Sequence, residues 1–204
     1  MDLTPVPIAP AGEDLCLDFA NTLAWRGSRA PAERLSRFAD LLDWLRSAAA
    51  MPAEMLPEAS SEEEAALFAQ AIALREAIYR MFAAVVDDDA LAEGDIAALN
   101  DALAAAPPRT RLVQTDAGYA WAAEPVGISL PMLLAPVLWS AADLLTDIDR
   151  SRVRRCANDQ CLWLFIDRSK GGTRRWCDMT SCGNRAKSRR HYLRSKPGAK
   201  SEPG

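Results

Sequence analysis

Hydrophobic residues recur at intervals of three and four along most of the first 106 residues, with acidic residues and arginines between them. This spacing is typical of helices that bury one face. Two long stripes of this kind predict helices over residues 31–50 and 62–86. The inward-facing residues are Leu35, Phe38, Leu42 and Leu45 in the first stripe and Phe68, Ile72, Arg75, Ile78 and Phe82 in the second.

Two shorter segments extend the helical pattern. A helix is predicted to begin at Gly94–Asp95, and its inward residues are Ile96, Leu99 and Leu103. The segment LCLDFANTL, residues 15–23, fits the period of a strand or of a helix, and we interpret it as a helix. Cys16 within it is interpreted as a buried apolar residue, because free cysteine is among the most buried residue types.

The pattern changes after Pro107–Pro108, which end the helical run. Two short strand-like runs flank a connection that contains Gly118, so a β-hairpin is predicted near residues 110–124. A last core helix is predicted from about Pro131 to Asp149 or beyond. No linker rich in glycine, serine and proline follows it, so the next segment is expected to be rigidly attached.

The 204 residues, half of them hydrophobic, suffice for one substantial core and a small additional module. Residues 1–149 hold nine arginines, no lysine and 24 acidic residues, a net charge of −15. Residues 150–204 hold 15 basic and four acidic residues, a net charge of +11, which is typical of a segment that contacts phosphates. We therefore predict an acidic helical domain over residues 1–149, a basic module over 150–196 and a disordered tail over 197–204.

The first residues, MDLTPVPIAPAGED, lack the basic stretch followed by an apolar stretch that marks a secretory signal. The longest apolar run, from Ile128 to Leu145, is interrupted by two prolines and Asp143 and is too short to span a membrane. A cytoplasmic location without membrane contact is therefore expected. Thiols stay reduced there, so clustered cysteines indicate a metal more often than disulfides.

Four cysteines form two C-x4-C pairs within the basic module, and fifteen residues separate the pairs. They are Cys156, Cys161, Cys177 and Cys182. Two close pairs joined by a hairpin are typical of a tetrahedral zinc site. Two disulfides or four unrelated buried thiols are the alternatives. Four sulfur ligands leave no open position for water or substrate, so the single zinc ion expected per chain would be structural.

The spacer between the two pairs predicts a hairpin, because a Gly-Gly turn separates two strand-like runs. Its elements are a strand at Leu162–Asp167, a turn at Ser169–Gly172 and a return strand at Arg174–Trp176. The aromatic residues Trp163, Phe165 and Trp176 could stack on bases, but we interpret them as part of the only apolar core of this small module. The arginines that adjoin the cysteines can neutralise the negative charge of a zinc ion with four thiolates; they are Arg154, Arg155, Arg174 and Arg175.

After Cys182 the chain is predicted to be helical. Cys182, Ala186 and Leu193 would lie on the side that faces the zinc. The opposite side carries Lys187, Arg190, His191 and Arg194. No acidic residue occurs between Met179 and Lys200, whereas solvated helix faces usually mix both signs. This favours a polyanion-binding helix over an ordinary solvated face.

The module RRCANDQCLWLFIDRSKGGTRRWCDMTSCGNRAKSRR resembles the CGNR zinc finger family, named after the tetrapeptide at Cys182 to Arg185. The body resembles the ABATE domain that precedes this finger, in LCLDFANTL, in RLSRFADLLDWL and in the last helix before Cys156. The resemblance implies that the four cysteines are zinc ligands. It also implies a stress-related role in DNA binding and transcriptional regulation.

Pattern and resemblance together predict a mainly α protein with a small β-hairpin (α+β), in which a helical domain precedes a four-cysteine zinc finger. The predicted function is zinc-dependent DNA binding by a bacterial transcription regulator. The candidate DNA contacts are Arg185, Lys187, Arg189, Arg190 and Arg194, mainly to phosphates. An RNA-binding or protein-docking module is the alternative. The acidic body is expected to form a homodimer or to sense a small-molecule effector.

An enzyme is not expected. His191 is the only histidine and lies in the basic helix, so residues 1–149 offer no histidine for acid-base chemistry or for activating a nucleophile. A glycine-rich phosphate-binding loop is also missing from the sequence. Chemistry by carboxylates alone remains formally open.

Overall fold

The structure is a computed structural model of the chain. It describes residues 6–8, 12, 14–48, 61–116, 118–123 and 129–195, so the predicted tail over 197–204 lies outside the described residues. Within these ranges, helices dominate and the strands form small antiparallel sheets, which confirms the predicted α+β class.

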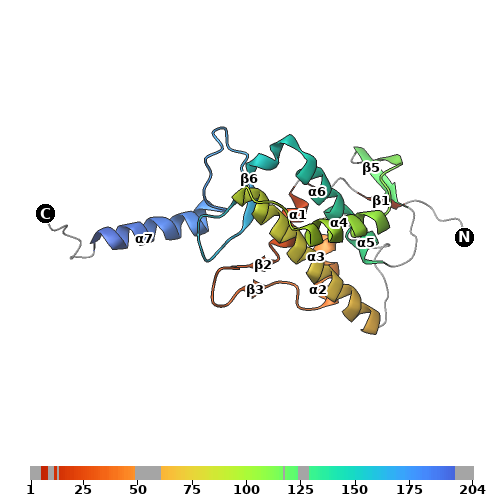
Figure 1. Cartoon of the computed structure of the whole chain (residues 1–204), viewed down its shortest axis with the longest axis horizontal. Helices are drawn as coiled ribbons and strands as arrows, with labels where there is room; N and C mark the ends of the chain where they lie inside the picture. The colour runs from red at the N-terminus through yellow and green to blue at the C-terminus, as the bar shows by residue number, and fades with distance from the viewer. Residues whose placement is uncertain are drawn as a thin grey trace, which may run out of the picture.

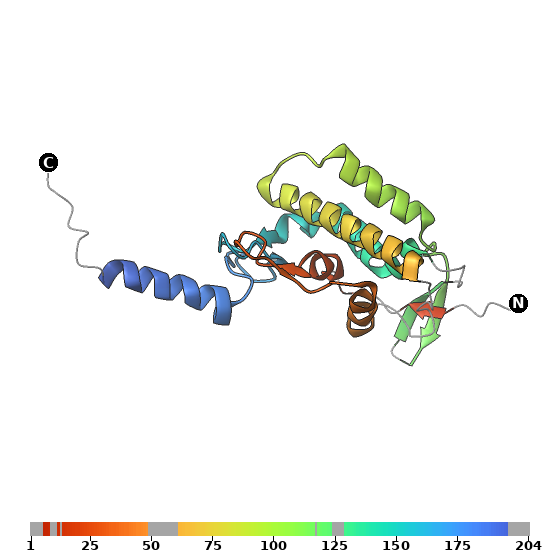
Figure 2. The ribbon, with the colours of Figure 1, turned by 90° about the horizontal axis from the view of Figure 1, so that it is seen from below.

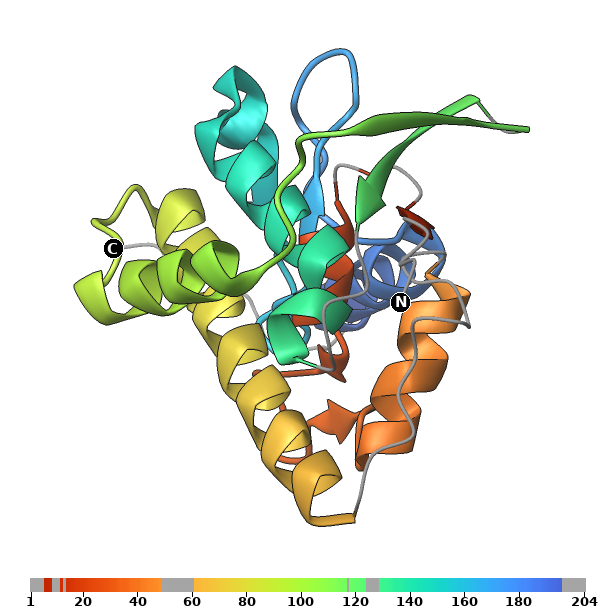
Figure 3. The ribbon, with the colours of Figure 1, turned by 90° about the vertical axis from the view of Figure 1, so that its right-hand side faces the viewer.

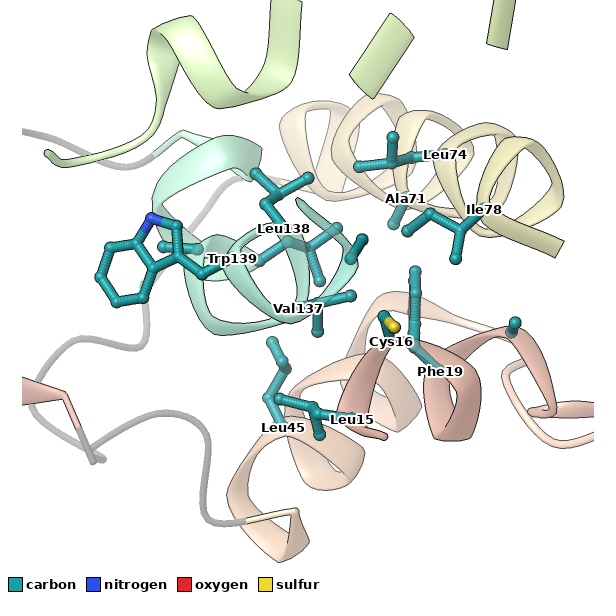
Figure 4. Close-up of a cluster of buried hydrophobic side chains, with 14 of the residues drawn as sticks. Leu15, Cys16, Phe19, Leu45, Ala71, Leu74, Ile78, Val137, Leu138 and Trp139 are labelled. Carbon is teal, nitrogen blue, oxygen red and sulfur yellow. The ribbon is translucent and has the colours of Figure 1, made fainter. Parts of the chain in front are cut away.

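Helix α1 (Leu15–Ala20) packs between α3 (Ser61–Asp87) and α6 (Ala135–Thr146) at the centre of the body. Figure 4 shows side chains of these helices meeting in one apolar cluster, among them Cys16, Phe19, Ile78, Val137 and Leu138. The helical interpretation of the segment around Cys16 is confirmed, and Cys16 is fully buried as predicted.

Helix α3 begins and ends within one residue of its predicted range. Its predicted inward face is buried at Arg75, Ile78 and Phe82 and half-buried at Phe68 and Ile72. Helix α4 (Glu93–Ala105) buries Leu99 as predicted, but the prediction for Ile96 was wrong, because this side chain is 37% exposed. Asp95 is buried in its place, since its carboxylate accepts a hydrogen bond from Arg80 Nε at 2.9 Å.

Helix α2 (Phe38–Ser47) is shorter than predicted at its beginning. Strand β3 (Ala32–Glu33) pairs with β2 (Leu23–Ala24) instead of joining the helix. The Asp40 carboxylate sets the helix start, because it accepts hydrogen bonds from the backbone N–H groups that precede Phe38. The predicted apolar stripe is nevertheless buried, at Leu35, Phe38, Leu42 and Leu45.

The predicted hairpin is confirmed by β4 (Leu112–Thr115) and β5 (Gly118–Ala123), which pair antiparallel. Strand β1 (Val6–Ile8), which the sequence pattern did not predict, pairs with β5 and completes a sheet of order β1-β5-β4. Figure 3 shows this hairpin extending away from the helices.

The last core helix is divided into α5 (Leu130–Leu133) and α6, with Leu134 between them. Pro136 accounts for the division, because it has no N–H to donate to the preceding turn. A 3-10 helix, η2 (Ile148–Arg152), then leads into the basic module. In the described part of the chain, no helix combines the length and the apolar composition that crossing a bilayer requires.

In the basic module, β6 (Val153–Arg155) pairs antiparallel with β7 (Leu164–Ile166). The prediction of a return strand at Arg174–Trp176 was therefore wrong. The first cysteine pair forms the tip of the hairpin. The loop after β7 is closed by a side chain, because the buried Asp167 carboxylate accepts hydrogen bonds from the N–H groups of Ser169 and Arg174.

The hairpin β6–β7 packs directly on the helical body. Val153, Leu164 and Ile166 belong to the main hydrophobic core. The buried Asn21 side chain extends the contact: its Nδ2 donates to Leu164 O at 2.8 Å and its Oδ1 accepts from Leu164 N at 3.0 Å. These residues attach the module firmly to the body.

The end of the module is different, because η3 (Met179–Gly183) and α7 (Asn184–Ser195) leave the body. Figures 1 and 2 show α7 projecting from one end of the molecule, while the sheet β1-β5-β4 lies at the other end. A helix placed in this way is accessible to a large partner.

Candidate metal centre and nucleic-acid interface

The four predicted ligands lie together. The Sγ atoms of Cys156, Cys161, Cys177 and Cys182 all lie within 4.8 Å of one another. The Cys161 and Cys177 sulfurs are 3.7 Å apart, and those of Cys177 and Cys182 are 3.8 Å apart. A zinc ion about 2.3 Å from each of four sulfurs would separate them by about 3.8 Å, whereas a disulfide requires about 2.05 Å. The sulfur spacing therefore fits a tetrahedral metal site.

The first cysteine pair is positioned by a tight turn. The N–H groups of Cys161 and Leu162 both donate to Asn158 O, at 2.8 and 3.2 Å. Leu162 adopts a φ of 56°, in the left-handed region. The Asn158 side chain approaches the second pair, because its Nδ2 donates to Cys182 Sγ at 3.5 Å. Asn158 therefore stabilises both halves of the site.

The second pair is positioned by Asp178, which precedes η3. Its side chain accepts from Ser181 N at 2.7 Å and from the Thr180 hydroxyl at 2.6 Å. These hydrogen bonds hold the pKa of Asp178 below its ordinary value. Asp178 thus fixes the turn that carries Cys182 into the site and starts the helix behind it.

The thiols of Cys156, Cys161 and Cys177 influence one another's ionisation. Hydrogen bonds from the thiols of Cys161 and Cys177 lower the pKa of Cys156 to about 2. Donation to that thiolate raises the pKa of Cys161 to about 12 and also raises the pKa of Cys177. Ionisation of one of these three thiols therefore opposes ionisation of the other two, and a bound cation would relieve this opposition.

Aromatic side chains surround the sulfurs. Phe165 is buried beside them, and Trp25, Trp163 and Trp176 are half-buried against the same cluster. Trp25 comes from the body, between β2 and β3, so this core is not formed by the basic module alone. The aromatic residues of the module do form an apolar cluster with the cysteines, but the prediction that they are its only apolar core was wrong, because β6 and β7 join the core of the body.

The candidate DNA contacts lie on α7. Arg185, Lys187 and Arg189 are exposed there. Arg190 and Arg194 belong to the same helix, and their side chains lie outside the described part of the structure. The segment from Met179 to Ser195 holds no acidic residue.

A groove lies between the first cysteine turn and α7. It has a volume of about 860 Å³. Its walls are Ala157 to Gln160 on one side, Arg175 and Trp176 on another, and Cys182, Arg185, Ala186 and Arg189 on the third. The structure thus places Arg175 with two of the candidate DNA contacts.

The sequence did not predict that Arg175 lies beside the candidate DNA contacts. It assigned this residue to charge neutralisation at the metal. The spacing of four residues could have grouped Arg185 with Arg189. No local pattern brings Arg175 to them, because their proximity depends on the folding of the cysteine turn. Of the other arginines near the cysteines, Arg155 forms an ion pair with Asp87 at 2.7 Å.

Comparison with known proteins agrees with this architecture. Residues 13–148 match the ABATE family, described as "Putative stress-induced transcription regulator". Residues 152–195 match the CGNR zinc finger. No curated protein matches the chain. The ABATE match covers about two thirds of the sequence, and the four clustered cysteines lie within the finger match. The chain therefore belongs to the ABATE family and carries a CGNR zinc finger.

Proposed function

We propose that this protein is a cytoplasmic, DNA-binding transcription regulator in which one structural zinc ion, held by Cys156, Cys161, Cys177 and Cys182, orients α7 towards DNA. The observation that carries this proposal is the position of the four sulfurs, at tetrahedral spacing, at the base of a projecting helix without acidic residues. The description of the ABATE family as a transcription regulator supports the regulatory role.

Zinc, when bound, supplies a cross-link between the two cysteine pairs and leaves no open coordination position. The residues of the chain position the second cysteine pair and the helix that follows it. Asp178 and Asn158 hold the second pair in place, and α7 follows it directly. The exposed cations at Arg185, Lys187 and Arg189 then face solvent, where DNA phosphates can displace the counterions.

Neither family description names an enzyme. We therefore propose binding without catalysis. The acidic body opposes contact with a polyanion, so DNA would meet the molecule at the end that carries α7.

The salt dependence of duplex binding tests this function. We expect Lys187→Ala to flatten the slope of log K against log[salt] by about 0.9, because one phosphate contact is lost. Arg111→Ala is the matched control, since Arg111 is an exposed arginine directly before β4, and the sheet that contains β4 lies at the end of the molecule opposite α7 (Figures 1 and 2). Fluorescence anisotropy of a labelled duplex gives both slopes. Equal slopes in the wild type and in Lys187→Ala, with equal affinities, would contradict the proposal and favour an RNA or protein partner.

A further inference from the structure

The arginines of the described structure differ in their partners. In the body, six of the nine arginines pair with carboxylates of the described residues, among them Arg26 with Glu76, Arg75 with Glu33 and Arg80 with Asp95. In the groove beside α7, Arg175, Arg185 and Arg189 form no ion pair with any carboxylate of the described residues. The one acid that lines the groove is Asp159. The residues that line the groove therefore carry a net positive charge, although the whole protein is acidic.

Two of these three guanidinium groups are stacked on aromatic rings. Arg185 Cζ lies 4.5 Å from the centre of the Trp25 ring, and Arg175 Cζ lies 5.6 Å from that of Trp176. A stacked guanidinium keeps the N–H groups at its edge available and loses little further freedom when it binds an anion. Arg175 and Arg185 are thus held ready to donate paired hydrogen bonds to phosphate oxygens.

The residue under Arg185 belongs to the body. Trp25 adopts a φ of 55°, in the left-handed region, and therefore occupies a fixed turn. Gly27 pins the same loop to the finger: its N–H donates to Gln160 O at 3.2 Å, and a Cβ at this position would lie 1.9 Å from Asp159 O. No residue with a side chain fits there without movement of the backbone. The body thus supports Arg185, which lines the groove.

We infer that this groove is a phosphate-binding site for the DNA backbone, in which Arg175, Arg185 and Arg189 contact phosphodiester oxygens and Trp25 of the ABATE domain holds Arg185 in position. The inference rests on the proposed DNA-binding function and adds two residues to it. Arg175 becomes a DNA contact, and Trp25 becomes a positioning residue. The open shape of the groove suits a polymer that passes through it, and three cations match the charge of successive phosphates.

The test compares duplex binding over a salt series for Arg175→Ala, Arg189→Ala and Trp25→Leu in the full-length, zinc-loaded protein. We expect Arg175→Ala and Arg189→Ala each to flatten the slope by about 0.9. Trp25→Leu should weaken binding about two- to fivefold, which corresponds to the loss of one exposed cation–π contact, with a smaller change of slope. Arg111→Ala again serves as the control, and the zinc content of each variant is measured to show that the finger is intact.

The possible outcomes distinguish a failure of the groove inference from a failure of the proposed DNA-binding function. If Lys187→Ala flattens the slope while Arg175→Ala and Arg189→Ala match Arg111→Ala, the groove inference is overturned and DNA binding by α7 stands. If none of these variants changes the slope, the proposed function fails as well. Unchanged affinity of Trp25→Leu, with normal zinc content, overturns the contribution of the body.

A free phosphorylated molecule is the other source of the same chemistry. Inorganic phosphate and deoxyadenosine monophosphate are therefore titrated into the wild type and into Arg175→Ala by calorimetry. We expect both dissociation constants to lie in the millimolar range or to be weaker, because a single phosphate engages only part of the groove. Micromolar binding of the mononucleotide that is lost in Arg175→Ala, together with duplex binding that does not depend on Arg175, would overturn the assignment to DNA.

Discussion

At the scale of single residues, the body contains a buried cation whose partner the sequence pattern does not identify. Arg75 is 2% exposed, and its guanidinium makes a two-pronged contact with Glu33, at 2.6 and 2.8 Å. Its Nε donates to Glu76 at 2.9 Å. The helical period of α3 placed Arg75 on the inward face, but Glu33 lies 42 positions away and no local pattern connects the two residues.

Removing this cation should lower the stability of the folded protein. We expect Arg75→Met to lower the free energy of unfolding by about 3 kcal/mol, because it leaves the partly buried Glu33 without its counter-ion. The matched control is Arg46→Met, since Arg46 pairs with Asp43 on the surface and such pairs contribute at most about 1 kcal/mol. Urea unfolding measures both. Equal losses in the two variants would contradict the structural role of Arg75.

The same contacts predict how stability depends on pH. Burial raises the pKa of Glu33, but the hydrogen bonds and charge of Arg75 outweigh it, so the pKa lies below the ordinary value of 4.5. A carboxyl with a lowered pKa in the folded state stabilises the fold above its ordinary pKa and loses this contribution as the pH falls. We therefore expect the free energy of unfolding to fall as the pH drops below about 5. The fall should be smaller in Arg75→Met, and an identical fall would show that this pair does not cause it.

At the scale of elements, the sequence predicts what depends on neighbouring residues and misses what depends on distant ones. The period of α3 gave its limits within one residue. The start of α2 was misplaced, because Ala32 and Glu33 pair with a strand that precedes them. The finger hairpin was misassigned for the same reason: β7 pairs with β6 across the first cysteine turn, and Asp167 closes the loop that follows. The cysteines themselves were identifiable, because their types and spacing carry the chemistry.

The junction between α1 and β7 offers a direct test. Asn21→Ala should destabilise the protein by about 2–4 kcal/mol, because it leaves the buried N–H and C=O groups of Leu164 without partners. Asn100→Ala, on the exposed face of α4, should change stability by less than about 0.5 kcal/mol. Thermal unfolding followed by circular dichroism compares the two. A loss in Asn21→Ala no larger than that of the control would mean that this side chain does not hold the finger to the body.

At the scale of the whole molecule, the net charge divides the chain into two parts, whereas the hydrophobic core joins these parts. The net charge changes from −15 over residues 1–149 to +11 over residues 150–204, yet the hydrophobic core continues from the body into β6 and β7. The division at residue 150 stays a prediction. The arrangement gives the basic end a rigid support, with α7 projecting from it (Figure 1) and Trp25 of the body stacked on Arg185.

The central claim is that bound zinc makes this basic end competent to bind DNA. The most direct measurement is the affinity for a labelled duplex of zinc-loaded protein, of protein stripped by a chelator under reducing conditions, and of stripped protein titrated with zinc. The account predicts that stripping weakens binding at least tenfold and that about one zinc per chain restores it, because the metal fixes the turn from which α7 starts. Duplex binding by zinc-free, fully reduced protein with the same affinity and the same salt dependence would contradict the account.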